Sequence, residues 1–311
     1  MMPLPSLIAL DWGTTNLHSY RIGDGGAVMD HRDWPLGIMQ VKDGNFAAIL
    51  DRVLQEWQPL PPGIPIIASG MIGSRQGWRE VPYAPCPAGL EDIAKAMVPI
   101  DWNGRRVWLV PGVSCSDRRG IPDVMRGEET QIFGAAGSAA SEEGLFVIPG
   151  THSKWVVAGK SRISRFATFM TGEMFAVLRE HSILGRTMRG AAVDEPAFQR
   201  GVAEVQATGG QLLHSLFGVR TLGLFGKLSE AEAAGYLSGL LIGAELLDGP
   251  TVLGFEGRPP PLVLIGHAGL ARHYAAAASS LGLAVREAAP EAAVLGLWRL
   301  ACTTGLVKEI A

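Results

Sequence analysis

The chain has 311 residues, with 27 Lys and Arg against 30 Asp and Glu, and its net charge at pH 7 is −3. This balance excludes a protein that holds nucleic acid or anionic lipid through a global basic field. Charged residues make up 18% of the chain and glycine accounts for 40 residues, which indicates a globular protein rich in turns. The length suggests two domains, or one large one.

The spacing of the cysteines and the lengths of the apolar segments indicate in which cellular compartment the protein is expected. Cys86, Cys115 and Cys302 are widely spaced, so they predict neither a disulfide framework nor a zinc site and fit a reducing cytoplasm. Residues 1–9 lack the basic start and long apolar stretch of a signal peptide. The longest uncharged stretch, residues 57–74, contains prolines that a membrane helix of roughly 20 apolar residues does not tolerate. We expect a cytoplasmic protein with no nucleic-acid partner and no membrane partner.

Short apolar runs bounded by turn residues predict strands in the first half of the chain. These strands are expected at residues 6–10, 17–22, 27–31, 64–68 and 107–110. Apolar residues recur at helical spacing over residues 46–57, which predicts an amphipathic helix on a sheet. Covered strands of this kind indicate an α/β layered domain.

The pattern begins again after a helix of small residues expected at 130–140. The order strand, Gly-Thr turn, strand, Gly turn, strand occurs in both halves, now with strands at 145–148, 155–158 and 162–169. Because chance rarely repeats both the element order and the turn chemistry, we predict an internal duplication. The expected boundary near Ser141 divides the chain into domains 1–141 and 142–311.

Beyond the repeat, helices alternate with short strands. Helices are expected at 173–181, 195–217, 229–247 and 291–302, with an alanine-rich helix ending at 281, and strands are expected at 262–265 and 284–287. This part of the chain is also α/β.

Two glycine–threonine turns follow buried strands at their carboxyl ends. The first reads Asp11-Trp12-Gly13-Thr14-Thr15-Asn16 and the second reads Pro149-Gly150-Thr151-His152-Ser153-Lys154. Glycine permits close backbone approach, successive N–H groups form an anion-binding nest, and hydroxyls add donors. Two such turns can hold one polyphosphate between them, with Asp11 as a ligand for metal-bound water. Two ordinary hairpins are the alternative.

These turns resemble the two phosphate motifs of the sugar kinase, hsp70 and actin superfamily, and Gly266-His267-Ala268-Gly269 is similar to its adenosine motif. The resemblance implies an α/β fold of two actin-like ATPase (ribonuclease H-like) domains, with the active site in the cleft between them. It implies ATP contacts at Gly13, Thr14, Thr15, Asn16, Gly150, Thr151, His152, Ser153, Lys154, Gly266, Ala268 and Gly269. Many members have Asp where this chain has Pro149, so the Mg²⁺ would depend mainly on Asp11.

More narrowly, three segments resemble the 2-dehydro-3-deoxygalactonokinases. They are residues 125–131 (MRGEETQ), 150–155 (GTHSKW) and 170–174 (MTGEM). This resemblance implies transfer of a phosphoryl group from ATP to the terminal C6 hydroxyl of 2-dehydro-3-deoxy-D-galactonate, in galactonate catabolism. Sugar kinases of the superfamily commonly place the catalytic base at the helix start that here contains Glu128 and Glu129. The choice between these two stays open, with Asp123 as a third candidate.

The implied substrate carries a carboxylate, which needs Arg, N–H or hydroxyl donors. Arg75 and Arg126 are the candidate cations, and the sequence does not choose between them. Two loops are candidates for further substrate contacts, namely Ser69, Gly70 and Met71 after a predicted strand, and Thr171, Gly172 and Glu173 at a predicted helix start.

Other functions remain open at this point. One is a kinase of the same fold that acts on another small substrate, such as a sugar, an anhydro-sugar or pantothenate. Another is a nucleotide-binding sensor or assembly protein, because this fold does not by itself imply phosphorylation of a small molecule. The oligomeric state is left open, with a homodimer among the candidates.

Overall fold

The computed structural model describes residues 4–137, 143–159, 162–190 and 193–308, so the predicted boundary at Ser141 lies outside the described residues. The chain forms two compact units. Unit 1 comprises Met1–Glu143, Ala158–Arg165 and Ala289–Ala311, and unit 2 comprises Gly144–Val157 and Phe166–Ala288. The predicted ranges 1–141 and 142–311 differ from these units in the placement of 142–143, 158–165 and 289–311. The duplication of two domains stays a prediction.

Unit 1 contains a six-stranded mixed sheet in the order β3-β2-β1-β4-β8-β7. Its strands are β1 (Leu7–Trp12), β2 (Leu17–Ile22), β3 (Val28–Trp34), β4 (Ile66–Gly70), β7 (Val98–Trp102) and β8 (Arg105–Leu109). The β1–β4 and β4–β8 pairs are parallel, and the other pairs are antiparallel. The carboxyl ends of β1 and β4 therefore lie side by side.

Short strands complete unit 1. A second sheet has the order β10-β9-β5, formed by β5 (Ala84–Pro85), β9 (Val113–Ser116) and β10 (Pro122–Met125). The two-residue strand β6 (Ala88–Gly89) pairs antiparallel with the first residues of β13 (Arg162–Phe169). Sequence analysis did not identify β5, β6, β7, β9 or β10.

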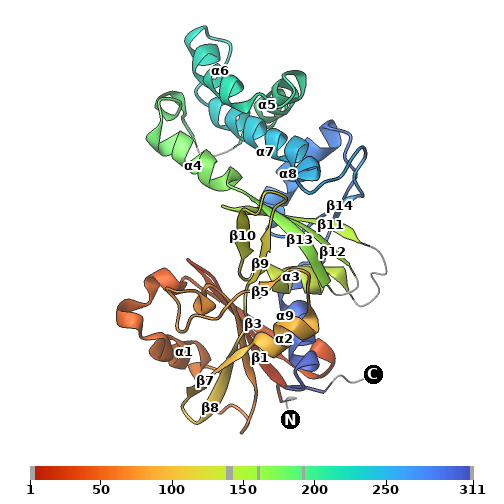
Figure 1. Cartoon of the computed structure of the whole chain (residues 1–311). Coiled ribbons are helices and arrows are strands. Elements are labelled where there is room, and N and C mark those ends of the chain that lie inside the picture. Colours follow the sequence, from red (N-terminus) through yellow and green to blue (C-terminus); the bar gives the residue numbers. More distant parts are fainter. Residues whose placement is uncertain (1–3, 138–142, 160–161, 191–192, 309–311) are drawn as a thin grey trace. The chain divides into compact units, whose positions relative to one another are not determined.

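Helices cover both faces of the unit 1 sheet, with α1 on one side of the strands and α9 on the other, and α2 and α3 pack on α9 (Figure 1). They are α1 (Phe46–Gln55), α2 (Leu90–Ala96), α3 (Glu128–Ala136) and α9 (Ala292–Thr303). Alternate strand residues such as Ile8 and Leu10 share one apolar core with Leu50 and Val53 of α1, as the period of two in a strand requires. The helix predicted at 46–57 is confirmed.

Helices α3 and α9 approach closely through glycine. A Cβ atom at Gly134 would lie 1.8 Å from the carbonyl oxygen of Ala292, and one at Gly296 would lie 1.8 Å from that of Thr130. Only glycine permits this backbone contact. Helix α9 also packs on β1 and β4, so the start of α3 is held against the sheet by the last described helix of the chain.

Unit 2 contains strands in the order β15-β14-β11-β12-β13. Besides β13, they are β11 (Gly144–Ile148), β12 (Ser153–Gly159), β14 (Leu262–Leu264) and β15 (Val285–Glu287). The helices are α4 (Thr171–His181), α5 (Glu195–Ala207), α6 (Leu212–Leu224), α7 (Ala233–Val252) and α8 (Ala268–Ser280). Helix α7 is buried along most of its length and packs against α4, α5, α6 and α8.

The helix predicted at 195–217 is wrong. The structure has two helices, α5 and α6, and Gly209 and Gly210 between them have φ values of +63° and +84°. Consecutive residues in the left-handed region end a right-handed helix, and glycine adopts this region at no steric cost. The other predicted helices and strands of this half are confirmed, with ends that differ by a few residues.

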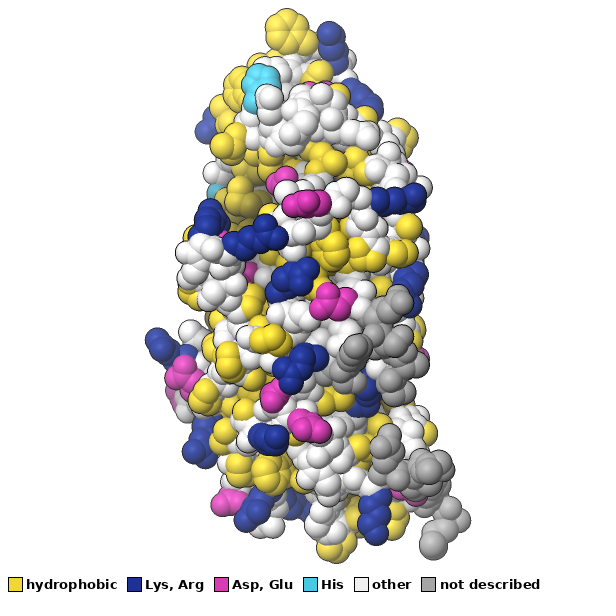
Figure 2. All heavy atoms as spheres, turned by 45° about the vertical axis from the view of Figure 1, so that its right-hand side comes forward, with side chains coloured by type: hydrophobic (Ala, Val, Ile, Leu, Met, Phe, Trp, Pro, Cys, Tyr) yellow, Lys and Arg dark blue, Asp and Glu magenta, His cyan; other side chains and the backbone are white. Residues whose placement is uncertain are grey.

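Among the described residues, no helix combines the length and the hydropathy that a membrane span requires. On the face drawn in Figure 2, basic and acidic side chains are interspersed among apolar and uncharged groups. This mixture agrees with the nearly balanced charge of the sequence.

Candidate functional site

Asp11 lies at the carboxyl end of β1, where the first turn begins. Its register partners are Ser69 on β4 and His18 on β2. Burial raises the pKa of Asp11 to about 6, and the nearby charge of Glu128 raises it while His18 lowers it. Because a bound cation would offset both the loss of water and the repulsion by a second carboxylate, this environment is suited to a metal ion.

Two glycines bring the start of α3 against the ends of β1 and β4. Gly70 has a φ of +89°, and a Cβ atom there would lie 2.7 Å from the carbonyl oxygen of Trp12 and 3.2 Å from Oδ1 of Asp11. Gly127 has a φ of +110°, and its Cβ would lie 3.3 Å from Cα of Gly70. Both positions require glycine, because an added side chain would be strained and would separate the segments.

Glu128 and Glu129 both fold back onto the backbone that precedes α3. The Arg126 N–H donates to Oε2 of Glu128 at 2.9 Å, and the Gly127 N–H donates to Oε2 of Glu129 at 2.7 Å. Glu128 is partly buried, whereas Glu129 is fully buried. Burial, followed by the charge of Glu128, raises the pKa of Glu129 to about 8. Glu129 therefore keeps its proton at neutral pH.

The two candidate cations have different surroundings. Arg75 is exposed, and its Nε lies 3.8 Å from Oε1 of Glu80. Arg126 is buried, its Nη2 donates to the carbonyl oxygen of Val81 at 2.7 Å, and its guanidinium lies 4.3 Å from the ring centroid of Tyr83. Within the part of the chain that the structure describes, Nε and Nη1 of Arg126 have no hydrogen-bond partner.

The remaining unit 1 candidates fall into two groups. Ser69 is buried, with no partner for Oγ among the described residues, and Met71 follows it as a partly buried residue. Asp123 lies on β10, where its Oδ1 accepts the N–H of Val124 at 2.7 Å. The structure thus brings Asp11, Ser69, Gly70, Arg126, Gly127, Glu128 and Glu129 together, through strand register and the glycine contacts.

The first turn is held by the segment that follows β3. The N–H groups of Gly37, Ile38 and Met39 donate to the carbonyl oxygens of residues 15, 13 and 14 at 2.9, 3.0 and 3.2 Å. The Gly13 N–H donates to the carbonyl oxygen of Asn16 at 2.9 Å. Residues 14–16 are exposed, so the turn combines a fixed backbone with accessible polar side chains.

The second turn, residues 149–152, joins β11 to β12 and packs on the start of α4. The Glu173 N–H donates to the carbonyl oxygen of Thr151 at 3.0 Å, and a Cβ at Gly172 would lie 2.4 Å from the carbonyl oxygen of Gly150. Nε2 of His152 hydrogen-bonds Oε2 of Glu173. Residues 150–153 (GTHS) and residues 170–173 (MTGE) therefore pack directly on each other.

Ser153 and Lys154 follow this turn but point into the protein. Both are buried. Oγ of Ser153 lies 2.9 Å from Oη of Tyr274, and Nζ of Lys154 donates to Oγ1 of Thr168 at 2.8 Å. The exposed polar side chains of this turn are those of Thr151 and His152.

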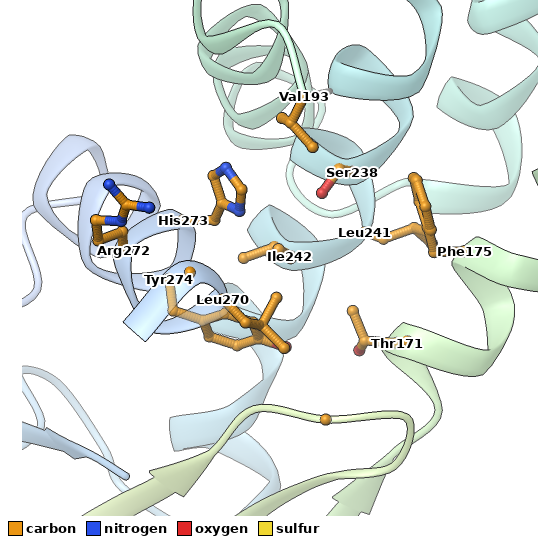
Figure 3. Close-up of a pocket in the computed structure, with 13 residues that line it drawn as sticks. Thr171, Phe175, Val193, Ser238, Leu241, Ile242, Leu270, Arg272, His273 and Tyr274 are labelled. Carbon is orange, nitrogen blue, oxygen red and sulfur yellow. The ribbon is translucent and has the colours of Figure 1, made fainter. Parts of the chain in front are cut away.

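A cavity of about 360 Å³ lies beside the second turn (Figure 3). Its lining residues are Gly150, Thr171, Gly172, Phe175, Val193, Ser238, Leu241, Ile242, Gly269, Leu270, Arg272, His273 and Tyr274. In Figure 3, Thr171 and Phe175 of α4 lie on one side of the cavity and Arg272 and His273 of α8 on the other. The walls are mostly apolar, with a few polar groups, as is usual for a small-molecule site.

Helix α8 presents the predicted adenosine motif to this cavity. Gly266 has a φ of +135°, and Nδ1 of His267 accepts the N–H of Gly269 at 3.2 Å, which caps the helix. Ala268 begins the helix, and Gly269 lines the cavity. The cavity residues that α7 contributes are not predicted from the sequence, because that helix is apolar on all sides and shows no cavity-facing stripe.

Known proteins resemble this chain over most of its length. Residues 11–300 match the family model described as 2-keto-3-deoxy-galactonokinase. A relative from Rhizobium meliloti (strain 1021), named as a 2-dehydro-3-deoxygalactonokinase, is 38% identical over 289 residues, covering 92% of this chain and 93% of the relative. The 2-dehydro-3-deoxygalactonokinase of Escherichia coli (strain K12) is 33% identical over 286 residues, covering 92% and 94%.

Solved structures agree with this result. A crystal structure from Sinorhizobium meliloti, described as a 2-dehydro-3-deoxygalactonokinase protein, has a TM-score of 0.87 at 38% identity and covers 95% of this chain and 98% of its own. A carbohydrate kinase from Novosphingobium aromaticivorans has a TM-score of 0.51 at 13% identity, covering 97% and 92%, and so shares the fold. The predicted α/β sugar-kinase fold is confirmed. The chain belongs to the 2-keto-3-deoxy-galactonokinase family of sugar kinases.

Proposed function

We propose that this protein transfers the γ-phosphoryl group of ATP to the terminal C6 hydroxyl of 2-dehydro-3-deoxy-D-galactonate. The product would be 2-dehydro-3-deoxy-6-phosphogalactonate, in galactonate catabolism. The observation that carries the proposal is the family match over residues 11–300, because it spans both glycine–threonine turns and the acidic start of α3. The two relatives that are named for this activity support the same substrate.

The cavity of unit 2 supports a nucleotide site. Its apolar walls suit the adenosine, and its edge includes Gly150 of the second turn and Gly269 of α8. Thr151 and His152 are exposed beside it and suit the phosphates. Residues 13–16 of the first turn belong to unit 1 and stay predicted phosphate contacts. Thr171 and Gly172 line the same cavity, which favours a contact with the nucleotide over one with the sugar acid.

The surroundings of Asp11 fit Mg²⁺. The raised pKa of Asp11 and its proximity to Glu128 mark a place where a cation is favourable. The described residues contain no group of three or more His, Cys, Asp or Glu that forms a complete metal site. Mg²⁺ bound to a nucleotide commonly uses one or two carboxylates, water and the phosphates instead. When bound, it neutralises charge on the phosphates.

Glu128 is the better supported base of the two acidic residues. Glu129 is buried and protonated at neutral pH, so it does not accept a proton there. Glu128 is partly buried and lies near Asp11. In the proposed step, Glu128 takes the proton of the C6 hydroxyl while that oxygen bonds to the γ-phosphorus and the bond to the ADP oxygen breaks.

Arg126 is the better supported partner for the substrate carboxylate. Its Nη2 is anchored on Val81, while Nε and Nη1 have no partner among the described residues, and Nη1 lies 3.0 Å from the Cβ position of Gly73. A guanidinium held in one orientation can bind a carboxylate through two N–H groups. Ser69 and the Gly70–Met71 backbone, at the carboxyl end of β4, are further candidate donors. Arg75 is exposed beside Glu80, which is typical of a solvated surface charge.

We place the protein in the cytoplasm, with a small-molecule substrate and without a nucleic-acid partner. The mixed charges on the face drawn in Figure 2 and the pI near 6.2 support the absence of a nucleic-acid partner. A cytoplasmic location would also supply MgATP and keep Cys86, Cys115 and Cys302 reduced.

A coupled assay of ADP release with MgATP tests the proposal. The substrates are 2-dehydro-3-deoxy-D-galactonate, its gluconate epimer and galactose, and the variants are Asp11→Asn and the exposed control Asp43→Asn. We expect turnover with the galactonate acid, retained in Asp43→Asn and reduced at least 100-fold in Asp11→Asn. Faster turnover of galactose or the epimer would contradict the substrate, and ATP hydrolysis unaffected by any sugar would favour a sensor or assembly protein.

A further inference from the structure

A buried polar centre lies beneath the second turn, and the proposed phosphoryl transfer does not involve it. At its middle is Glu245 of α7, whose exposed fraction is 2%. Oε1 of Glu245 accepts the indole N–H of Trp155 at 2.8 Å, and Oε2 accepts the hydroxyl of Tyr274 at 2.6 Å. Burial raises the pKa of Glu245, and hydrogen bonds from Thr171, Tyr274, Trp155 and Ser153 lower it.

The directions of these hydrogen bonds assign a role to Ser153. Tyr274 has one hydroxyl hydrogen, and it is donated to Glu245. Oγ of Ser153 lies 2.9 Å from Oη of Tyr274 and also hydrogen-bonds Glu245, so its hydroxyl hydrogen is donated to one of these two oxygens. Its only hydroxyl hydrogen points into the protein, so Ser153 does not donate to a phosphate. Ser153 instead connects the second turn to Tyr274 and Glu245 through hydrogen bonds.

The centre joins the elements that form the cavity. Ser153 and Trp155 belong to β12 directly after the second turn, Thr171 begins α4, and Tyr274 belongs to α8. Thr171 and Tyr274 also line the cavity, where Figure 3 shows them on separate elements. A Cβ atom at Gly249 would lie 2.5 Å from the Trp155 ring, so α7 carries the carboxylate close to β12.

We propose that Glu245 is a positioning residue for the nucleotide. It does not touch the nucleotide, but through Ser153, Thr171 and Tyr274 it sets the spacing of the second turn, α4 and α8 around the cavity. Without its carboxylate, buried donors from three elements lose their common acceptor, and these donors would be satisfied only by a rearrangement of the cavity walls. This inference rests on the proposed nucleotide role of the cavity.

The test measures MgADP affinity by calorimetry, together with separate KM values for ATP and for the sugar acid. The variants are Glu245→Gln, which keeps the size of the side chain, and Tyr274→Phe, which removes one oxygen atom. Asp248→Asn is the matched control, because it removes an exposed carboxylate from the same helix. We expect Glu245→Gln and Tyr274→Phe to weaken MgADP binding and raise the ATP KM about tenfold. The sugar-acid KM should stay within about twofold, and Asp248→Asn should match the wild type.

The outcomes separate this inference from the proposed function. MgADP affinity that is unchanged in a folded Glu245→Gln protein would overturn the positioning role alone. If Glu245→Gln does not fold, the MgADP affinity of Tyr274→Phe is used instead, and an unchanged affinity would again overturn the positioning role. Equal increases of both KM values would also contradict the inference, because they would indicate general loss of structure. A wild-type protein that binds no MgADP would overturn both proposals.

Discussion

Glu129 provides a quantitative prediction about stability, because its side chain is fully buried and its pKa is raised. In the unfolded chain the carboxyl loses its proton near pH 4.5, whereas in the folded protein it keeps the proton up to about pH 8. Between these values the folded state holds the Glu129 proton and the unfolded chain does not, so the contribution of Glu129 to stability falls as pH rises, by about 1.4 kcal/mol per pH unit. The full interval amounts to about 5 kcal/mol.

Glu129→Gln removes this dependence, because glutamine does not ionise and its oxygen can still accept the Gly127 N–H. The free energy of unfolding is measured by urea titration at pH 5, 6, 7 and 8 for both proteins. The value of the variant minus that of the wild type should rise by about 1.4 kcal/mol per pH unit. Glu91→Gln is the control, since Glu91 lies in the first turn of α2 and is exposed. A difference between Glu129→Gln and wild type that is independent of pH would refute the reasoning.

Three further predictions concern the site and its support. The value of kcat/KM should fall as pH is lowered through about 6, because protonation of Asp11 would remove the proposed metal ligand; a flat profile from pH 5 to 7 would contradict this. Glu128→Gln should lower kcat at least 100-fold while Glu129→Gln retains most activity, and equal losses would refute Glu128 as the base. Gly134→Ala should destabilise the protein by about 3 kcal/mol in urea titration, because its Cβ would overlap the α9 backbone. Gly218→Ala, in an open part of α6, should stabilise it by about 0.5–1 kcal/mol, and similar effects of the two would contradict the packing argument.

Local patterns were sufficient to predict the turns and most elements of this fold. The short strands β5, β6, β9 and β10 have two to four residues each, so they carry no period. Strands β5 and β6 pair with the distant strands β9 and β13, whereas β9 and β10 pair with each other. The break between α5 and α6 does have a local signal, the Gly209–Gly210 pair. It was missed because the apolar spacing of α5 continues into α6.

The candidate site was predictable in its residue types but not in its electrostatics. Glu128 and Glu129 are identical in sequence terms, and only the packing of α3 buries one and leaves the other partly accessible. The polar centre was not predictable at all, because Ser153 and Tyr274 are separated by 121 residues and Trp155 and Glu245 by 90. Such contacts arise from tertiary structure, which one sequence does not specify by pattern.

The position of α9 also determines when unit 1 can fold. This helix packs on β1, β4 and α3, although it follows the whole of unit 2 along the chain. During synthesis, one face of the first sheet therefore emerges from the ribosome long before its covering helix. Unit 2 is complete by residue 288, so it can fold while unit 1 still exposes apolar strands. The segment that is translated first thus keeps one apolar face uncovered until α9 emerges.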